Sequence, residues 1–139
     1  MKANIYIDGG NLYFGLLKGR PEVKWLDLDA FCRRLAGVDH ELNAIKYFTA
    51  NIKTYPHDPA SVERQNLYLQ AVEAKGWIET IFGYYNKNKT WLPARRSDLI
   101  HHVTIYRDIP RDLPTICQLP DEVPVGKNGK TIRRPAAWK

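Results

Sequence analysis

An aspartate followed by two glycines and an asparagine stands directly after a short apolar run near the start of the chain. Residues 4–7 read Asn-Ile-Tyr-Ile, and Asp8, Gly9, Gly10 and Asn11 follow them. This pattern predicts a β-strand that ends in a carboxylate, beside a turn open enough for a phosphate or a hydrated metal ion to approach. Mg²⁺ and Mn²⁺ prefer oxygen ligands and keep several waters, so Asp8 is a candidate ligand for either cation.

The elements that must position Asp8 alternate between strand and helix patterns. Their order, β-α-β-α-β, predicts a parallel sheet wrapped by helices, with a ligand site at the carboxyl ends of the strands. Apolar spacing predicts strands at 4–7, 42–50 and 77–84 and a helical turn through 12–17. Capping and helix-breaking residues predict two helices between these strands. One runs from the N-cap Asp27 to Gly37, and the other begins near Asp58 and Pro59 and ends at Gly76.

Thr49, like Asp8, lies at the carboxyl end of a predicted strand. Its hydroxyl could hold a substrate phosphate or a metal-bound water, and a purely structural role is the alternative. The adjacent His101 and His102 would face opposite ways on a strand, so they favour a solvated pair in a loop over a shared metal site.

A polar turn at residues 86–89 separates two aromatic pieces and predicts a β-hairpin arm or a loop. Cations beside aromatic rings can hold phosphates and stack unpaired bases, which is typical of a surface that binds unpaired nucleic acid. An ordinary solvated hairpin is the alternative. The residues of this candidate nucleic-acid surface are Tyr84, Tyr85, Lys87, Lys89, Trp91, Arg95 and Arg96.

The last part of the chain, residues 105–139, is rich in proline and predicts at most a short helix followed by an extended strap across the domain. Residues 126–130 form a turn signal, Gly-Lys-Asn-Gly-Lys. The spacing of a phosphate-binding loop is not met and no strand precedes these residues, so that interpretation is rejected.

Composition limits the class of protein. With 139 residues, 44% of them hydrophobic, the chain fits one domain, and its formal charge of +6 favours a polyanionic partner. Cys32 and Cys117 are far apart and form no CxxC pair, so buried or idle thiols are expected rather than a zinc site or a disulfide. No apolar run approaches the roughly 20 residues of a membrane span and no signal peptide is recognised, so a cytoplasmic protein with no membrane partner is expected.

Several separate segments together resemble the NYN family, nuclease-like domains related to PIN ribonucleases. The resemblance covers most of residues 1–92 and 105–138, and the ordered set of segments is more specific than the opening motif alone. The segments that carry it are IYIDGGNLY at 5–13, WLDL at 25–28, IKYFTA at 45–50, RQNLYL at 64–69 with Ala71, QLPD at 118–121 and RPAAW at 134–138.

The resemblance implies a three-layer α/β/α, Rossmann-like fold in which an acidic cluster binds Mg²⁺ or Mn²⁺ and hydrolyses RNA phosphodiesters. Asp8 would be a direct or water-mediated metal ligand, and Asn11 would orient the carboxylate or a metal-bound water. Asp98, in the segment Arg-Ser-Asp-Leu-Ile at 96–100, is the candidate second acid and metal ligand. The function expected is a metal-dependent endoribonuclease.

One region of such domains is almost absent here. Residues 1–92 would form the core with its hairpin, 93–104 a shortened junction, and 105–139 the strap of one domain, without the helix and strands that normally carry the other acids. Asp27, Asp29 and Asp108 are poor substitutes, the first two being expected helix caps. Three explanations are open: a true internal deletion, self-association or partner binding through the sheet edge that strand 4–7 leaves exposed, or a join of two segments across residues missing between them.

A second function class stays open beside the nuclease. Without enough acids for turnover, the same fold would act as a nucleic-acid-binding or protein-interaction module that uses the basic and aromatic residues around the hairpin. Hydrolysis should require Asp8 and a divalent metal, whereas binding should weaken with salt and survive the loss of Asp8.

Overall fold

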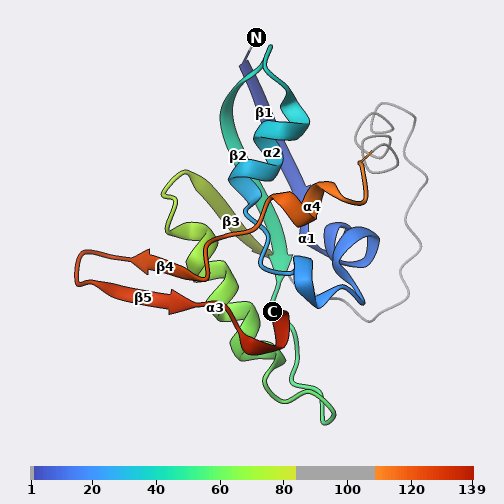
Figure 1. Cartoon of the computed structure of the whole chain (residues 1–139), viewed down its shortest axis with the longest axis vertical. Coiled ribbons are helices and arrows are strands. Elements are labelled where there is room, and N and C mark those ends of the chain that lie inside the picture. The colour runs from blue at the N-terminus through green and yellow to red at the C-terminus, as the bar shows by residue number, and fades with distance from the viewer. Residues whose placement is uncertain (1, 84–108) are drawn as a thin grey trace.

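A parallel sheet forms the base of the molecule. The computed structural model describes residues 2–83 and 109–139 (Figure 1). Strands β1 (Lys2–Asp8), β2 (Glu41–Ala50) and β3 (Ile78–Gly83) form a three-stranded parallel sheet in the order β1-β2-β3. The predicted α/β class and the parallel pairing of these strands are therefore confirmed. The predicted hairpin arm lies outside the described residues.

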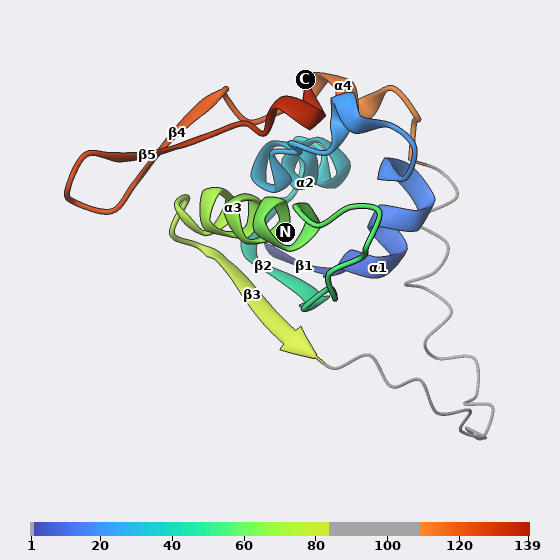
Figure 2. The same cartoon turned by 90° about the horizontal axis from the view of Figure 1, so that it is seen from below.

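Two helices, α2 (Leu28–Ala36) and α3 (Ser61–Glu73), cover one face of this sheet (Figure 2). The caps predicted for α2 are confirmed, because the Asp27 carboxylate accepts a hydrogen bond from the Ala30 amide at 3.1 Å and Gly37 ends the helix at φ 75°. A positive φ of this kind is strained for residues with a side chain and is adopted readily by glycine.

Helix α3 begins later than Asp58 and Pro59 indicated. Its first residue is Ser61, and no side chain caps its N-terminus. Asp58 instead closes a turn through a backbone bridge with Tyr55, and its carboxylate pairs with Arg64 one turn into the helix. The predicted helix is correct, but its start is displaced because Asp58 belongs to the preceding turn.

The core lies between the sheet and the two helices. Ile7, Ile45 and Ile78 come from the three strands, and their neighbours are supplied by both helices and by the segment that precedes α2. Among the largest fully buried side chains are Trp25, Leu12, Leu26, Leu28 and Ile45. Within α2, Leu28, Phe31 and Cys32 are buried at the spacing of one helix face.

The C-terminal strap forms a further layer on the side of α2 and α3 that faces away from the sheet (Figure 2). Its described residues, 109–139, contain the short helix α4 (Leu113–Ile116), strands β4 (Glu122–Val125) and β5 (Lys130–Arg133), and a 3₁₀ turn at Ala136–Trp138. The short helix and the turn at 126–129 were predicted. The antiparallel pairing of β4 with β5 was not, and it replaces the extended chain expected there.

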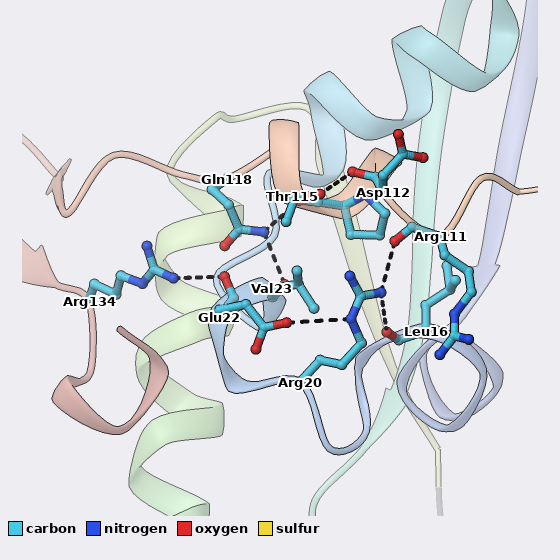
Figure 3. Close-up of polar contacts among 10 residues, drawn as sticks. Leu16, Arg20, Glu22, Val23, Arg111, Asp112, Thr115, Gln118 and Arg134 are labelled. Atoms are coloured by element: carbon cyan, nitrogen blue, oxygen red, sulfur yellow. Dashed lines mark hydrogen bonds and ion pairs between the residues drawn. The ribbon is translucent and has the colours of Figure 1, made fainter.

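Hydrogen bonds to backbone carbonyls hold the strap on the segment between α1 and α2 (Figure 3). Gln118 Nε2 donates to the Val23 carbonyl at 3.1 Å, and Arg134 Nη2 donates to that of Glu22 at 2.9 Å. In the opposite direction, Arg20 Nη1 donates to the carbonyl of Arg111 in the strap at 2.9 Å. The strap is thus bound at several points along residues 20–27.

Strand β1 lies at an edge of the sheet formed by the described residues, where β2 is its partner strand. This is the edge position that the sequence predicted for residues 4–7. Self-association through it stays a prediction. On the face opposite the two helices, Tyr6 and Phe48 are exposed and their rings stack with centroids 6.4 Å apart.

Both cysteines are free and buried, as expected for idle thiols. Burial raises the pKa of the Cys32 thiol to about 12, with the nearby carboxylates of Asp29 and Asp27 adding to the shift. Burial is also the main cause of the raised pKa of Cys117. Both groups are therefore protonated at neutral pH and poor nucleophiles. In the described parts of the chain, none of the helices combines the length and the apolar character needed to cross a membrane.

Candidate functional site

Asp8 and Asn11 are in direct contact at the end of β1. The chain turns there into the short helix α1 (Gly9–Leu12). Asp8 Oδ1 accepts hydrogen bonds from the amides of Gly10 at 2.9 Å and Asn11 at 3.1 Å, and Oδ2 accepts one from Asn11 Nδ2 at 3.1 Å. The carboxylate is exposed, and its orientation is fixed by donors on Gly10 and Asn11.

Gly9 allows α1 to approach β2 closely. A Cβ on Gly9 would lie 2.7 Å from the Phe48 carbonyl oxygen and 2.8 Å from Cζ and Oη of Tyr47. Such distances are shorter than any ordinary carbon contact, and the carbonyl belongs to the central strand of the described sheet. Glycine at position 9 is therefore needed for packing, and it sets the position of the Asp8 turn against β2.

Replacement of Gly9 by alanine is expected to lower the free energy of unfolding by about 1–3 kcal/mol, the usual cost of an overpacked site. Gly15→Ala is the matched control, because the Cβ it would add meets no atom within 4 Å beyond its own local stretch of chain. That variant should be neutral or slightly stabilising, since alanine is favoured over glycine in helical segments. Urea unfolding followed by circular dichroism measures both. Equal stability of the two variants would show that α1 does not press on β2.

The chain continues from α1 into a π-helical segment, Tyr13–Leu17, in which the Lys18 amide bonds the Tyr13 carbonyl at 2.7 Å. Leu16 and Leu17 are buried, whereas Tyr13 and Phe14 are exposed. A shallow hollow of about 380 Å³ lies beside the segment and is lined by Asn11, Phe14, Gly15 and Leu16. Short π-helical stretches occur often at functional sites.

Thr49 and Asp8 both lie at the carboxyl ends of their strands, but on opposite faces of the sheet. The register places Asp8 opposite Phe48, so Thr49 is one residue further along β2. Because side chains alternate along a strand, Thr49 shares its face with Tyr47, on the side of the helices, while Asp8 shares a face with Phe48. The sequence correctly predicted that Thr49 lies near the carboxyl end of its strand. The alternation of side chains along β2 places it on the face opposite to that of Asp8.

The expected capping role is confirmed for Asp27, whereas Asp29 lies in the first turn of α2 and makes an ion pair instead. Asp27 is buried, caps α2 and pairs with Lys75 Nζ at 3.2 Å. Asp29 pairs with Arg33 Nε at 3.0 Å one turn along the same helix. Both carboxylates are therefore committed to α2.

The other predicted site residues lie outside the described residues. They are the second acid Asp98, the nucleic-acid candidates Lys87, Lys89, Trp91, Arg95 and Arg96 with Tyr84 and Tyr85, and the pair His101 and His102 with Asp108. Within residues 2–83 and 109–139, no three His, Cys, Asp or Glu side chains gather as a metal-binding group. The described part of the chain thus contributes Asp8 and Asn11 to the predicted site.

Comparison with known proteins gives one partial likeness. The chain is 37% identical over 107 residues to 6-hydroxy-3-succinoylpyridine 3-monooxygenase HspA of Pseudomonas putida. The aligned region covers 64% of this chain and 34% of that protein. The chain therefore spans about a third of the length of this curated relative. No family model matches the chain. No solved structure matches it either.

Proposed function

We propose that the chain is a metal-dependent ribonuclease of the NYN type, with the three-layer α/β/α arrangement of that family. The observation that carries the proposal is the Asp8 carboxylate, exposed at the carboxyl end of a parallel strand and oriented through both of its oxygens by the Gly10 and Asn11 amides and by Asn11 Nδ2. Ligand sites in parallel α/β sheets lie at this end of the strands.

The donor set suits a hard divalent cation. Asp8 supplies carboxylate oxygen, and Mg²⁺ in proteins is commonly held by one or two carboxylates together with waters and substrate phosphates. Asp8 and Asp98 would hold the ion. When bound, the ion would supply a water of lowered pKa and shield the charge that builds on the phosphodiester.

The residues themselves have separate tasks in this proposal. The amides of Gly10 and Asn11 hold Asp8 in one orientation, so little reorganisation is needed when a cation or phosphate arrives. Asn11 Nδ2 ties the second carboxylate oxygen to α1. The formal charge of +6 would draw RNA to the surface, in a manner that weakens with salt.

Metal dependence is the direct test of the proposed function. The purified chain, with its intact mass verified, is incubated with a labelled single-stranded RNA in Mn²⁺, in Mg²⁺ and in EDTA. Cleavage is expected with either metal and none in EDTA, because the bound water loses its lowered pKa when the ion is removed. Product ladders on a denaturing gel measure it. Equal cleavage in EDTA, or no cleavage under any condition, would contradict the proposal.

The second candidate is a module of the same fold that binds nucleic acid without turnover. It is favoured by the local role of Asp8, whose two oxygens accept hydrogen bonds from the first residues of α1, as an N-cap does. RNA binding in EDTA without cleavage in either metal would support this candidate over the nuclease.

A further inference from the structure

Two aromatic rings are exposed immediately after the Asp8 turn. Phe14 exposes 66% and Tyr13 38% of its surface, and the rings meet edge to face with centroids 5.3 Å apart. Their neighbours Leu12, Leu16 and Leu17 fill the core side of the same segment. Tyr13 and Phe14 therefore lie on the outer side of this segment, while its leucines make the contacts with the core. The fold does not require an aromatic ring at position 14.

A lysine accompanies each ring. Lys18 Nζ lies over one face of the Phe14 ring, 5.1 Å from its centroid, and Lys24 Nζ lies over one face of the Tyr13 ring, 5.3 Å from its centroid. The Glu22 carboxylate, two residues before Lys24 in the sequence, is paired with Arg20 Nε at 3.5 Å. Rings combined with cations are the arrangement on which unpaired bases stack while their phosphates are neutralised. We call these four residues, Tyr13, Phe14, Lys18 and Lys24, the aromatic platform.

The aromatic platform is continuous with the candidate site. The hollow beside Phe14 is also lined by Asn11, whose side chain donates to the Asp8 carboxylate. A nucleotide stacked on Phe14 would therefore lie beside the hollow that Asn11 also lines.

We propose that the aromatic platform binds single-stranded RNA, with a base stacked on Phe14 and phosphates held by Lys18 and Lys24. This inference rests on the proposed function, since it supplies the nuclease site with its substrate. It adds a binding surface separate from the residues predicted around the hairpin. It also commits to unpaired RNA, because the bases of a duplex are stacked on one another and present no free face to a protein ring.

The test is RNA affinity in EDTA, where cleavage cannot interfere. Anisotropy of a 5′-fluorescein oligouridine of about twelve nucleotides, a length within the usual range of single-strand sites, is measured with the full chain and its variants. Phe14→Leu keeps an apolar side chain without the ring, and Phe14→Trp keeps a ring. Lys18→Ala removes one platform cation. Lys130→Ala is its matched control, an exposed lysine on the β4-β5 hairpin, which lies on the opposite side of the molecule from α1 in both views (Figures 1 and 2).

Phe14→Leu is expected to weaken binding about tenfold, the usual effect of losing one base stack, while Phe14→Trp binds like the unmodified chain. Lys18→Ala should reduce the slope of log affinity against log salt by about one, and Lys130→Ala should leave it unchanged. Wild-type affinity in Phe14→Leu would overturn the inference, as would a chain that binds no RNA. Circular dichroism of each variant verifies the fold.

The two proposals fail differently. If the chain cleaves RNA with metal and Phe14→Leu both binds and cleaves equally well, the ribonuclease stands and the aromatic platform is rejected. If no variant cleaves but Phe14→Leu loses affinity, the platform stands and the ribonuclease is rejected. Greater affinity for a duplex of the same length than for the single strand would also overturn the platform.

Discussion

Substitution of Asp8 by asparagine is expected to lower metal-dependent RNA cleavage about a hundredfold or more while leaving the fold intact. A bound metal contributes several kcal/mol to such reactions, and about 1.4 kcal/mol corresponds to a factor of ten in rate. Asparagine removes the negative charge that would hold the ion. It can still accept the Gly10 and Asn11 amides, because asparagine caps helices about as well as aspartate.

Asp27→Asn is the matched control for this substitution. Asp27 also caps a helix through an amide hydrogen bond, to Ala30, but it is buried beside Lys75 at the start of α2. The control therefore changes the same functional group at a second helix cap and should retain cleavage per folded molecule. Initial rates of oligonucleotide cleavage in Mn²⁺ are compared, and RNA binding in EDTA is measured alongside. Undiminished cleavage by the Asp8 variant would place the reaction elsewhere in the chain.

Local sequence signals predicted most of the elements that position Asp8. The cap pair Asp27 and Gly37 fixed α2, because capping depends on residues within one turn of the helix end. The start of α3 was displaced, since Asp58 is used by a turn with Tyr55 that the sequence signal does not distinguish from a cap. Where a residue has two local uses, its pattern alone cannot choose between them.

The β4-β5 hairpin was missed for a different reason. Prolines at and around its strands, Pro124 among them, argue against a sheet, because proline lacks an amide donor. Pro124 nevertheless pairs with Thr131 in a ribbon of two strands, where each strand has an outer edge that needs no donors. The turn at 126–129 was recognised, but the sequence pattern does not show that β4 and β5 also pack against α3, which is distant in sequence.

At the site, the contact between Asp8 and Asn11 could be predicted because it spans three residues. The face of the sheet on which Thr49 lies relative to Asp8 could not, since it depends on the register of β1 against β2. The aromatic platform left a signal that was not used: Phe14 falls outside the buried stripe of Leu12, Leu16 and Leu17. An aromatic residue off the apolar face of a short helical segment is the observation that could have identified it.

Replacement of Trp25 by alanine is expected to have the largest effect on stability, a loss of about 3–5 kcal/mol, the range typical for removing a large buried aromatic side chain. Trp25 is 0% exposed, its ring contacts Tyr68 and Trp138, and its indole Nε1 donates to the Pro120 carbonyl at 2.8 Å. One side chain thus joins α3 to two points of the C-terminal strap. Since small domains are stable by only about 5–15 kcal/mol, the loss is a large share of the total.

Graded variants separate the packing of Trp25 from its hydrogen bond. Trp25→Phe keeps most of the apolar volume but removes the donor to Pro120, and it should cost less, about 1–3 kcal/mol. Trp77→Ala is the matched control, because Trp77 is only partly buried and its ring lies against the guanidinium of Arg33 with 4.8 Å to the centroid. Urea unfolding followed by circular dichroism measures the midpoint of each variant. We expect the lowest midpoint for Trp25→Ala, a higher one for Trp25→Phe, and a midpoint above that of Trp25→Ala for the control Trp77→Ala. Equal midpoints for Trp25→Ala and Trp77→Ala would contradict the central role of Trp25.

Loss of Trp25 should also affect the candidate site through the strap. Arg20 Nη1 donates both to the carbonyl of Leu16, in the π-helical segment Tyr13–Leu17, and to the Arg111 carbonyl in the strap. The strap therefore supports the π-helical segment that carries Phe14, although it contributes no side chain to the Asp8 contacts described. In Trp25→Ala, residues 109–139 should become sensitive to trypsin under native conditions and RNA affinity in EDTA should fall with them. Release of the strap without a change in RNA affinity would show that the platform is held by the sheet and α1 alone.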